Sequence, residues 1–312
     1  MPRLSSSRIA IIGAGHVGAT IAYAMMLRAL VSEIVLIDSN TELAAAEAAD
    51  LADANALARP VRIWAGSYAD ASTADIAIIA AGAATQGSES RMSVLARSAA
   101  IVADCVRALA DAGFVGIILV AANPVDIMTH VAFGHAGLAA GRVIGTGTLL
   151  DSSRLRQAIA AAFDVAPSAV VGQVLGEHGD SEVAILSTAR IGGLPLDRFA
   201  PGHVIDQAAM AQSVREAGYD IIAGKGYTSF GIATATVHIC EAILRNERCV
   251  LPVSTLTTGE FGIEGVFLSL PCLIGRGGVE RVLLPDVSDA ERTALQRSAE
   301  VIRSAAAQLD IP

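Results

Sequence analysis

The feature that most constrains the fold of this chain is a glycine-rich turn between a short apolar strand and a helix. Gly13-Ala14-Gly15-His16-Val17-Gly18 follows the apolar run at 8–12 and opens a helical pattern at about 17–30. Glycines at this spacing allow a tight turn and a close approach of the backbone to a ligand, and the following helix directs its N-terminal amides at a pyrophosphate. The turn therefore predicts a strand–turn–helix unit that binds a dinucleotide.

A carboxylate after the second strand indicates which dinucleotide is bound. The apolar run at 33–38 ends in Asp38, twenty residues after Gly18. A carboxylate at this place accepts hydrogen bonds from both ribose hydroxyls of NAD and repels the additional phosphate of NADP. We therefore predict NAD as the cofactor. The side chain of His16 is expected to be only a residue of the loop.

The first half of the chain alternates short apolar runs with helical patterns. The further predicted strands are 61–64, 75–80, 117–121 and 142–144, and an alanine-rich helix is predicted at 41–57. This alternation predicts a parallel sheet that is covered by helices on both faces through right-handed crossovers. The first half is therefore expected to be a doubly wound Rossmann domain.

After about Gly147 the pattern becomes mixed. Helices are predicted at 149–163, 204–223 and 227–246, and strand-like runs at 169–175, 249–256, 265–274 and 278–284. Ser288 and Glu291 have the spacing of a capping box that opens a last helix. We predict an α/β fold with an NAD-binding Rossmann domain at residues 1–146 and a mixed α+β catalytic and substrate domain at residues 147–312.

Composition argues against several other classes of protein. The chain is 53% hydrophobic and only 17% charged, which argues against disorder, and its net charge of -9 argues against a nucleic-acid partner. Its longest uncharged runs, 112–125 and 127–141, are shorter than the roughly 20 residues of a membrane span. The N-terminus lacks the apolar core of a signal peptide, and the four cysteines form no C-x-x-C pair. We expect a cytoplasmic protein without a membrane partner or a bound metal.

Three polar motifs carry groups suited to acid–base chemistry and anion binding. Asn123 follows the strand at 117–121, and ligands of open α/β sheets bind at the carboxyl ends of strands. Asp151 and Arg154 share one face of a predicted helix, where an ion pair within the helix is the simpler interpretation. His178 lies between glycines just after an apolar strand, and the ordinary imidazole pKa of about 6.5 suits proton transfer at neutral pH.

Arg91 ends a stretch of small residues, 82–90, that follows the strand at 75–80. Small residues without bulky anchors are typical of a loop that closes over a site. A solvated arginine at the start of a helix is the alternative interpretation, although the helix dipole disfavours it.

Taken together, these motifs resemble the L-lactate/malate dehydrogenase family from Ile9 to about Leu309. The matching strings are IIGAGHVGAT, IVLIDSN, AAGAATQGSESR, AANPVDI, IGTGTLLDSSRLR, GEHGDSE and KGYTSFGIA, in the order and spacing of the family. The glutamate in GEHGD is closer to the lactate branch than to the malate branch. The resemblance implies an NAD-dependent oxidoreductase acting on a small 2-oxo or 2-hydroxy acid, with pyruvate and L-lactate favoured, and working as a homodimer or homotetramer.

The resemblance also implies a role for each motif residue. His178 would donate the proton while hydride passes from NADH to the C2 carbonyl, and Asp151 would hold the imidazolium. Arg154 would bind the substrate carboxylate through two parallel hydrogen bonds, and Arg91 would polarise the carbonyl after loop closure. The other predicted substrate contacts are Thr85, Gln86, Asn123, Thr228 and Ile232. The predicted cofactor contacts are Gly13, Gly15, His16, Val17, Gly18, Asp38, Ala81, Gly82 and Asn123.

Two departures from the family pattern concern specificity and regulation. Thr85 occupies the specificity position, six residues before Arg91, where lactate enzymes usually carry Gln and malate enzymes Arg. The bacterial site for fructose 1,6-bisphosphate pairs an arginine with a histidine. Here Arg156 matches the arginine, and Val171 replaces the histidine.

Three alternatives stay open at this point. One is a malate dehydrogenase or a broader 2-oxo-acid reductase. Another is an NAD-dependent glycosidase, which would need a metal-binding set of Cys and His, and only Cys240 after His238 comes near one. The third is a catalytically idle NAD-binding protein, against which the intact set of Arg91, Asp151, Arg154 and His178 argues.

Overall fold

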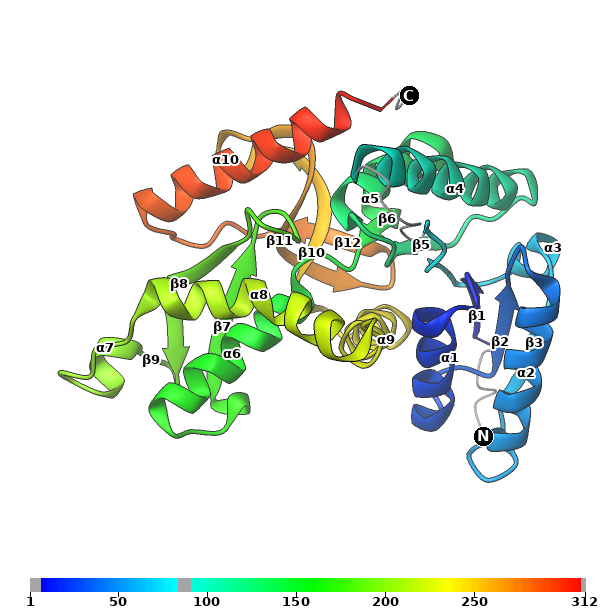
Figure 1. Cartoon of the computed structure of the whole chain (residues 1–312), viewed down its shortest axis with the longest axis horizontal. Coiled ribbons are helices and arrows are strands. Elements are labelled where there is room, and N and C mark those ends of the chain that lie inside the picture. Colours follow the sequence, from blue (N-terminus) through cyan, green and yellow to red (C-terminus); the bar gives the residue numbers. More distant parts are fainter. Residues whose placement is uncertain (1–6, 84–90, 310–312) are drawn as a thin grey trace.

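The computed structural model describes residues 7–83 and 91–309, and its centre is a nine-stranded sheet. The strand order is β12-β11-β10-β6-β5-β4-β1-β2-β3 (Figure 1). The first six strands are β1 (Arg8–Ile12), β2 (Glu33–Ile37), β3 (Arg62–Ala65), β4 (Ile76–Ile79), β5 (Ile117–Val120) and β6 (Val143–Gly145). All of these six pair in parallel, in the doubly wound order 6-5-4-1-2-3. The predicted Rossmann topology is confirmed.

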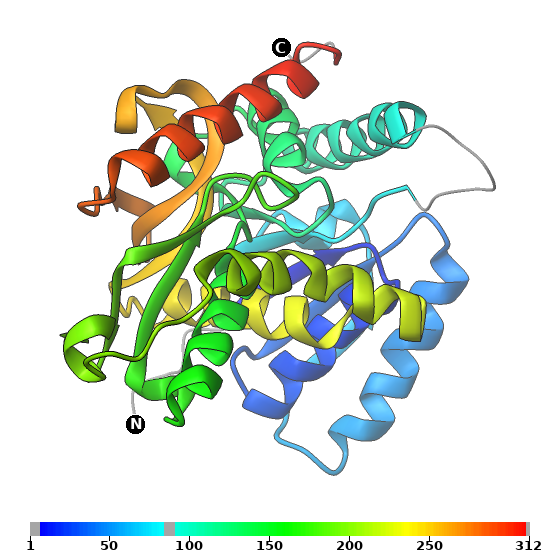
Figure 2. The same ribbon diagram turned by 60° about the vertical axis from the view of Figure 1, so that its left-hand side comes forward.

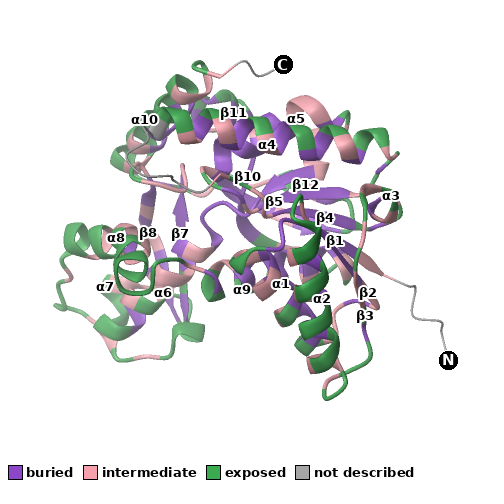
Figure 3. Ribbon diagram, turned by 45° about the vertical axis from the view of Figure 1, so that its right-hand side comes forward, coloured by how far each residue is buried: buried purple, intermediate pink, exposed green. Residues whose placement is uncertain are grey.

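Nearly continuous apolar strands account for this parallel sheet. β4 (IAII) and β5 (IILV) are buried at every position, as strands must be when helices cover both faces of a sheet. The helices of this half are α1 (His16–Arg28), α2 (Thr41–Asn55), α3 (Tyr68–Ala71), α4 (Arg91–Asp111) and α5 (Val125–Ala136), and the short turn η1 (Ala140–Arg142) precedes β6. Figure 3 shows the buried strands inside and the exposed outer surface of α2. The strand order reverses between β1 and β4, and a ligand crevice is expected at their carboxyl ends.

The second half adds a separate antiparallel sheet and extends the main one. After α6 (Leu149–Phe163) and η2 (Pro167–Ala169), a three-stranded sheet contains β7 (Val170–Leu175), β8 (Val183–Ile191) and β9 (Leu194–Pro195). The helices α7 (Leu196–Phe199), α8 (Gln207–Lys225) and α9 (Phe230–Leu244) come next. The strands β10 (Cys249–Thr258), β11 (Glu264–Gly275) and β12 (Gly278–Val282), with η3 (Glu260–Gly262) between the first two, join the main sheet where β10 pairs with β6. The predicted mixed character of this half is confirmed.

The last helix, α10 (Asp289–Ala306), begins as predicted. The hydroxyl of Ser288 accepts a hydrogen bond from the amide of Glu291 at 3.3 Å, and the carboxylate of Glu291 accepts one from the amide of Ser288 at 2.8 Å. This reciprocal pair is the predicted capping box. Leu295 and Ile302 are buried on the inner face of the helix, so α10 is amphipathic.

The sequence patterns predicted neither α5 nor β8. α5 (VDIMTHVAFGHA) is buried on most of its surface, so it has no polar stripe that would reveal a helical period. In β8 more buried and less buried residues alternate along the strand. Its first four residues, VAIL, are all apolar, so the sequence does not show this alternation. Among the described residues, no helix is both long and apolar enough to span a membrane.

Candidate active site

The loop that carries His178 is anchored to three different elements. Gly176 exchanges two backbone hydrogen bonds of 3.0 Å with Ser269 of β11. The amide of Glu177 donates to the hydroxyl of Ser298 on α10 at 2.8 Å, and the amide of His178 donates to Asp126 on α5 at 2.8 Å. Hydrogen bonds on consecutive residues leave this loop little freedom. The backbone therefore holds the imidazole in a fixed place.

The N-terminal part of α6 is tied to the strand that leads into this loop. The hydroxyl of Ser152 accepts a hydrogen bond from the amide of Val174 at 2.8 Å, and the hydroxyl of Thr148 donates to the carbonyl of Val174 at 2.5 Å. All of these atoms are buried. Asp151, one residue before Ser152, is thereby held at a fixed distance from the histidine loop.

One buried carboxylate joins the two predicted catalytic motifs. Asp151 is 1% exposed, and its Oδ2 lies 2.6 Å from Nδ1 of His178. Its Oδ1 accepts a hydrogen bond from Arg154 at 2.8 Å. The ion pair within the helix is confirmed, and it is also part of a larger network. A proton donor and a guanidinium that are 24 residues apart in sequence share one carboxylate.

The charges around His178 favour its protonated form. Burial lowers the pKa of the imidazole, but the charge and hydrogen bond of Asp151, helped by Asp126 and Glu182, outweigh it and raise the pKa to about 9. Burial likewise opposes the charge of Asp151, yet His178 and Arg154 keep the pKa of this carboxyl below its ordinary value. At neutral pH the pair is therefore an imidazolium and a carboxylate.

Asp126 is a second buried carboxyl behind the histidine loop. It is 2% exposed, and burial raises its pKa to about 6 although the amide of His178 opposes this shift. It lies in the first turn of α5, where the helix dipole favours a negative charge. Sequence reasoning missed this residue, since its partner is a backbone amide 52 residues away.

A cavity of about 630 Å³ lies at the reversal of strand order. Five of the nine predicted cofactor residues line it, namely Gly13, Gly15, Asp38, Ala81 and Gly82. A side chain at Gly13 (φ +101°) would approach the amide nitrogen of Ala81 to 2.6 Å, and one at Gly18 would collide with the carbonyl of Gly13. Next to Gly15 the space is open. A close-packed turn with an open approach to a helix N-terminus is what a dinucleotide pyrophosphate requires, so these residues fit NAD.

Asp38 lies in the wall of this cavity and also holds the glycine turn. Its Oδ2 accepts a hydrogen bond from the amide of Ala14 at 2.7 Å, and its Oδ1 accepts one from the amide of Asn40 at 2.8 Å. Oδ1 also accepts a hydrogen bond from the hydroxyl of Ser39 at 3.4 Å, whereas Oδ2 can accept a further one. The carboxylate thus supports the turn and can still accept hydroxyl donors.

The prediction that His16 is only a loop residue is wrong. His16 is the first residue of α1, and its ring stacks on Tyr227 with 4.0 Å between centroids. Sequence reasoning missed Tyr227 because it lies more than two hundred residues further along the chain. Its neighbour Thr228 is half-buried in the segment between α8 and α9. The stack therefore joins the cofactor turn to the segment that carries a predicted substrate contact.

Several other predicted residues lie at element ends. Val17 follows His16 in the first turn of α1, Ile232 lies half-buried in the first turn of α9, and Asn123 is exposed three residues after β5. Thr85 and Gln86 lie outside the described residues. Arg91 begins α4, and its side chain is outside the described part of the structure, so its role in the site stays a prediction.

Helix α8 covers the catalytic side chains, a relation that the sequence did not reveal. Gly218 of α8 faces Arg154. A Cβ atom at this position would lie 3.7 Å from the guanidinium of Arg154. Tyr219 donates a hydrogen bond to Asp180 of the histidine loop at 2.9 Å. Only Val214 of the helix is buried, and Figure 2 shows α8 on the outside of the molecule. α8 thus covers the catalytic side chains mainly through polar contacts and buries little apolar surface against the rest of the protein.

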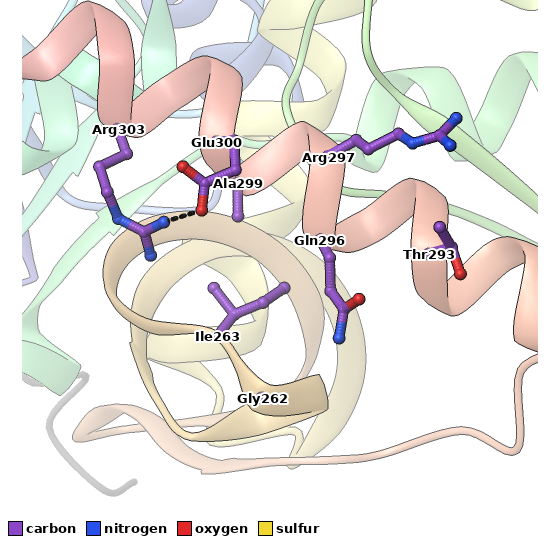
Figure 4. Close-up of a pocket in the computed structure, with 8 residues that line it drawn as sticks. All are labelled: Gly262, Ile263, Thr293, Gln296, Arg297, Ala299, Glu300 and Arg303. Carbon is purple, nitrogen blue, oxygen red and sulfur yellow. Dashed lines mark hydrogen bonds and ion pairs between the residues drawn. The ribbon is translucent and has the colours of Figure 1, made fainter.

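A smaller cavity, of about 350 Å³, lies between α10 and η3 and contains none of the predicted site residues (Figure 4). Arg303 forms an ion pair with Glu300 there, and Gln296 donates a hydrogen bond to the carbonyl of Phe261 at 3.0 Å. The polar groups of this cavity thus largely form their hydrogen bonds and ion pairs within the protein itself.

Comparison with known proteins agrees with this arrangement. The family model for the NAD-binding domain of lactate/malate dehydrogenases matches residues 7–145, and the model for their alpha/beta C-terminal domain matches residues 148–309. The chain belongs to the lactate/malate dehydrogenase family. The L-lactate dehydrogenase of Thermus aquaticus is 42% identical over 307 residues, which are 97% of this chain and 99% of that protein.

Two further similarities extend over the same length. The L-lactate dehydrogenase of Thermoanaerobacter sp. (strain X514) is 40% identical over 98% of this chain and 100% of that protein. The crystal structure of a minor L-lactate dehydrogenase from Enterococcus mundtii, in a ligand-bound form, matches with a TM-score of 0.94 at 37% identity and covers 97% of this chain and 98% of its own. Family membership therefore rests on sequence and on fold together.

Proposed function

We propose that this chain is an NAD-dependent L-2-hydroxy-acid dehydrogenase that interconverts L-lactate and pyruvate. The observation that carries the proposal is the shared carboxylate of Asp151, which binds the imidazole of His178 at 2.6 Å and Arg154 at 2.8 Å. This arrangement supplies a proton donor and a carboxylate-binding group in one rigid unit. Reduction of a 2-oxo acid needs both.

In the proposed reaction the bound nicotinamide supplies the hydride to C2. The imidazolium of His178 donates its proton to the carbonyl oxygen as the carbonyl π bond breaks, so that pyruvate becomes lactate. Asp151 stabilises the imidazolium and orients the ring, while the guanidinium of Arg154 binds the substrate carboxylate through parallel hydrogen bonds. Arg91 is assigned the polarisation of the carbonyl, where negative charge develops. In the reverse direction neutral His178 accepts the hydroxyl proton.

The substrate preference rests on Thr85 and Gln86, neither of which carries a charge. A second carboxylate, as in oxaloacetate, would be costly to bury without a cation. Pyruvate has only a methyl group at this place, and Thr85 is smaller than the usual Gln, so longer side chains such as that of 2-oxobutyrate should also fit. We therefore propose pyruvate as the preferred substrate, with tolerance of 2-oxobutyrate.

The test is NADH oxidation with pyruvate, 2-oxobutyrate and oxaloacetate, compared through kcat/KM. We expect pyruvate to exceed oxaloacetate by at least about tenfold, since an unpaired buried charge costs well over 1.4 kcal/mol. The His178→Asn variant, purified in the same way, excludes a contaminating dehydrogenase. Thr85→Arg should raise oxaloacetate relative to pyruvate, because a bidentate pair with the second carboxylate becomes possible. A wild type that prefers oxaloacetate would support the malate alternative, and no turnover of any 2-oxo acid would refute the proposal.

We further propose that the protein is cytoplasmic, that residues 1–146 and 147–312 are its two functional units, and that it works as a homodimer or homotetramer. Exposed apolar side chains on adjacent helices support association: Tyr23 and Leu27 on α1 are 46% and 54% exposed, and Phe230 on α9 is 70% exposed. Light scattering should therefore give two or four times the chain mass of 31.9 kDa. A monomer at micromolar concentration would contradict this part of the proposal.

A further inference from the structure

Glu182 is a buried carboxyl beside the catalytic pair, and none of the motif roles uses it. It immediately precedes β8 and is 7% exposed. One carboxylate oxygen each from Glu182 and Asp151 and one ring nitrogen of His178 all lie within 4.8 Å of one another. At this distance, away from bulk water, the charge of Glu182 acts strongly on the imidazole.

Charged groups from two helices and from the histidine loop face Glu182. Asp151 and Arg154 project from α6, and Arg215 acts on it from α8. The Nε atom of Arg215 is buried without a hydrogen-bond partner among the described residues. His178 itself also interacts with Asp126 of α5. Two carboxyl groups therefore share one site with the imidazole, and two arginines lie near enough to oppose their charge.

Two carboxyl groups this close cannot both ionise easily. Asp151 has hydrogen bonds from His178 and Arg154, so it keeps its charge. Burial first, and then the charge of Asp151, raise the pKa of Glu182 to about 8, against the opposing effects of His178, Arg215 and Arg154. Glu182 is thus mostly neutral at pH 7 and gains its charge in mildly alkaline solution.

We propose that Glu182 is a positioning residue for the reaction, a third carboxyl whose charge sets how firmly His178 holds its proton. The expected change in the pH dependence of turnover rests on the proposed function. The expected change in the pKa of His178 does not. When the pH is high enough for Glu182 to ionise, a negative charge appears beside the imidazolium and its proton. The new negative charge strengthens the hold on that proton, so the enzyme keeps its pyruvate-reducing form to higher pH.

A negative charge at position 182 raises the pKa of His178, so Glu182→Gln, which keeps the shape and removes the charge, lowers it. We expect a downward shift of about one unit. The alkaline fall of kcat/KM for pyruvate then moves to lower pH by a similar amount. The rise of lactate oxidation with pH moves in the same direction.

The matched control is Glu216→Gln. Glu216 is an exposed residue of α8, next to Arg215, and it accepts a hydrogen bond from Gln212. This substitution removes the same charge from a solvated place, where water screens it, so the pKa of His178 should move by less than about 0.2 unit. Glu182→Met, which has a similar volume and no charge, should behave as Glu182→Gln does and serves as a second variant if the amide disturbs folding.

The experiment measures the His178 titration directly, by nuclear magnetic resonance of the full chain with labelled histidine rings and without substrate. The chain has six histidines, and His178→Asn identifies the resonance of interest. A downward shift in both Glu182 variants, with none in Glu216→Gln, supports the proposal. An unchanged His178 titration in folded Glu182→Gln overturns it. Absence of pyruvate turnover in the wild type would refute the proposed function instead, and the titration would still decide the role of Glu182.

Discussion

The cofactor cavity and the catalytic centre are built in different ways. The turn of the cavity is one contiguous stretch of backbone. Gly13 has a positive φ there, and the amide of Ala14 donates a hydrogen bond to the side chain of Asp38, just after β2. The catalytic centre comes from distant segments, and its contacts are buried charged side chains, with Asp151 joining His178 and Arg154. The cofactor cavity is thus defined mainly by the shape of the backbone, and the catalytic centre by interactions between charged side chains.

This difference predicts how each region responds to substitution. A change in the cavity should alter which cofactor binds and how tightly, with little effect on the pH dependence of the reaction. A change in the network should alter substrate binding, rate or pH dependence while cofactor affinity stays the same. Single substitutions in each region test this separation.

The largest effect is expected for His178→Asn. Losing the proton donor should lower kcat by at least about 10²–10⁴-fold, because general acid catalysis alone contributes this much. NADH affinity, measured by fluorescence titration, should stay within about twofold, since the described cavity residues do not include His178. A variant that keeps a tenth of the wild-type turnover would remove His178 from the mechanism.

Arg154→Lys should have the next largest effect. Lysine keeps the charge but cannot present two parallel donors to a carboxylate. Losing one charged hydrogen bond to the substrate costs about 1.5–3 kcal/mol, so kcat/KM for pyruvate should fall roughly 10- to 150-fold. The loss should lie mainly in KM, and NADH affinity again serves as the control. An unchanged KM for pyruvate would show that another group binds the substrate carboxylate.

A smaller effect is expected in the cofactor cavity. Asp38→Asn removes the charge that repels the phosphate of NADPH and keeps one of the two oxygens that accept amide hydrogen bonds. The ratio of kcat/KM for NADH over NADPH should narrow by about tenfold, the equivalent of 1.4 kcal/mol. The pH profile of pyruvate reduction should keep its shape. Equal use of both cofactors by the wild type would contradict the role of Asp38.

No effect at all is expected from fructose 1,6-bisphosphate. Arg156 is half-buried on α6, while Val171 on β7 is 60% exposed and offers no cation. A phosphate needs several charged donors to bind well. Pyruvate saturation curves should therefore be unchanged by fructose 1,6-bisphosphate at about millimolar concentration. A clear decrease in KM would mean that the sugar bisphosphate finds other cations.

The two regions also differ in how far the sequence revealed them. The six parallel strands and the glycine turn could be predicted because apolar runs and glycine spacing are local signals. The motif residues Asp151 and Arg154 were also visible, as neighbours on one helix face. Glu182, Asp126 and Tyr227 were missed, because each acquires its partner only when segments far apart in the chain fold together. α5 was missed for a related reason, since a helix buried on most sides has no polar stripe.

The central claim is that His178, held by Asp151, carries the proton of the reaction, and the most direct test is a pH profile in both directions. The pKa of His178 is raised to about 9, so its protonated form is complete well below that pH and is lost as pH rises through it. We predict that kcat/KM for pyruvate falls above pH 9 while kcat/KM for lactate rises through the same range, with NADH affinity flat throughout. Pyruvate reduction that stays constant from pH 7 to about 10.5 would contradict the claim.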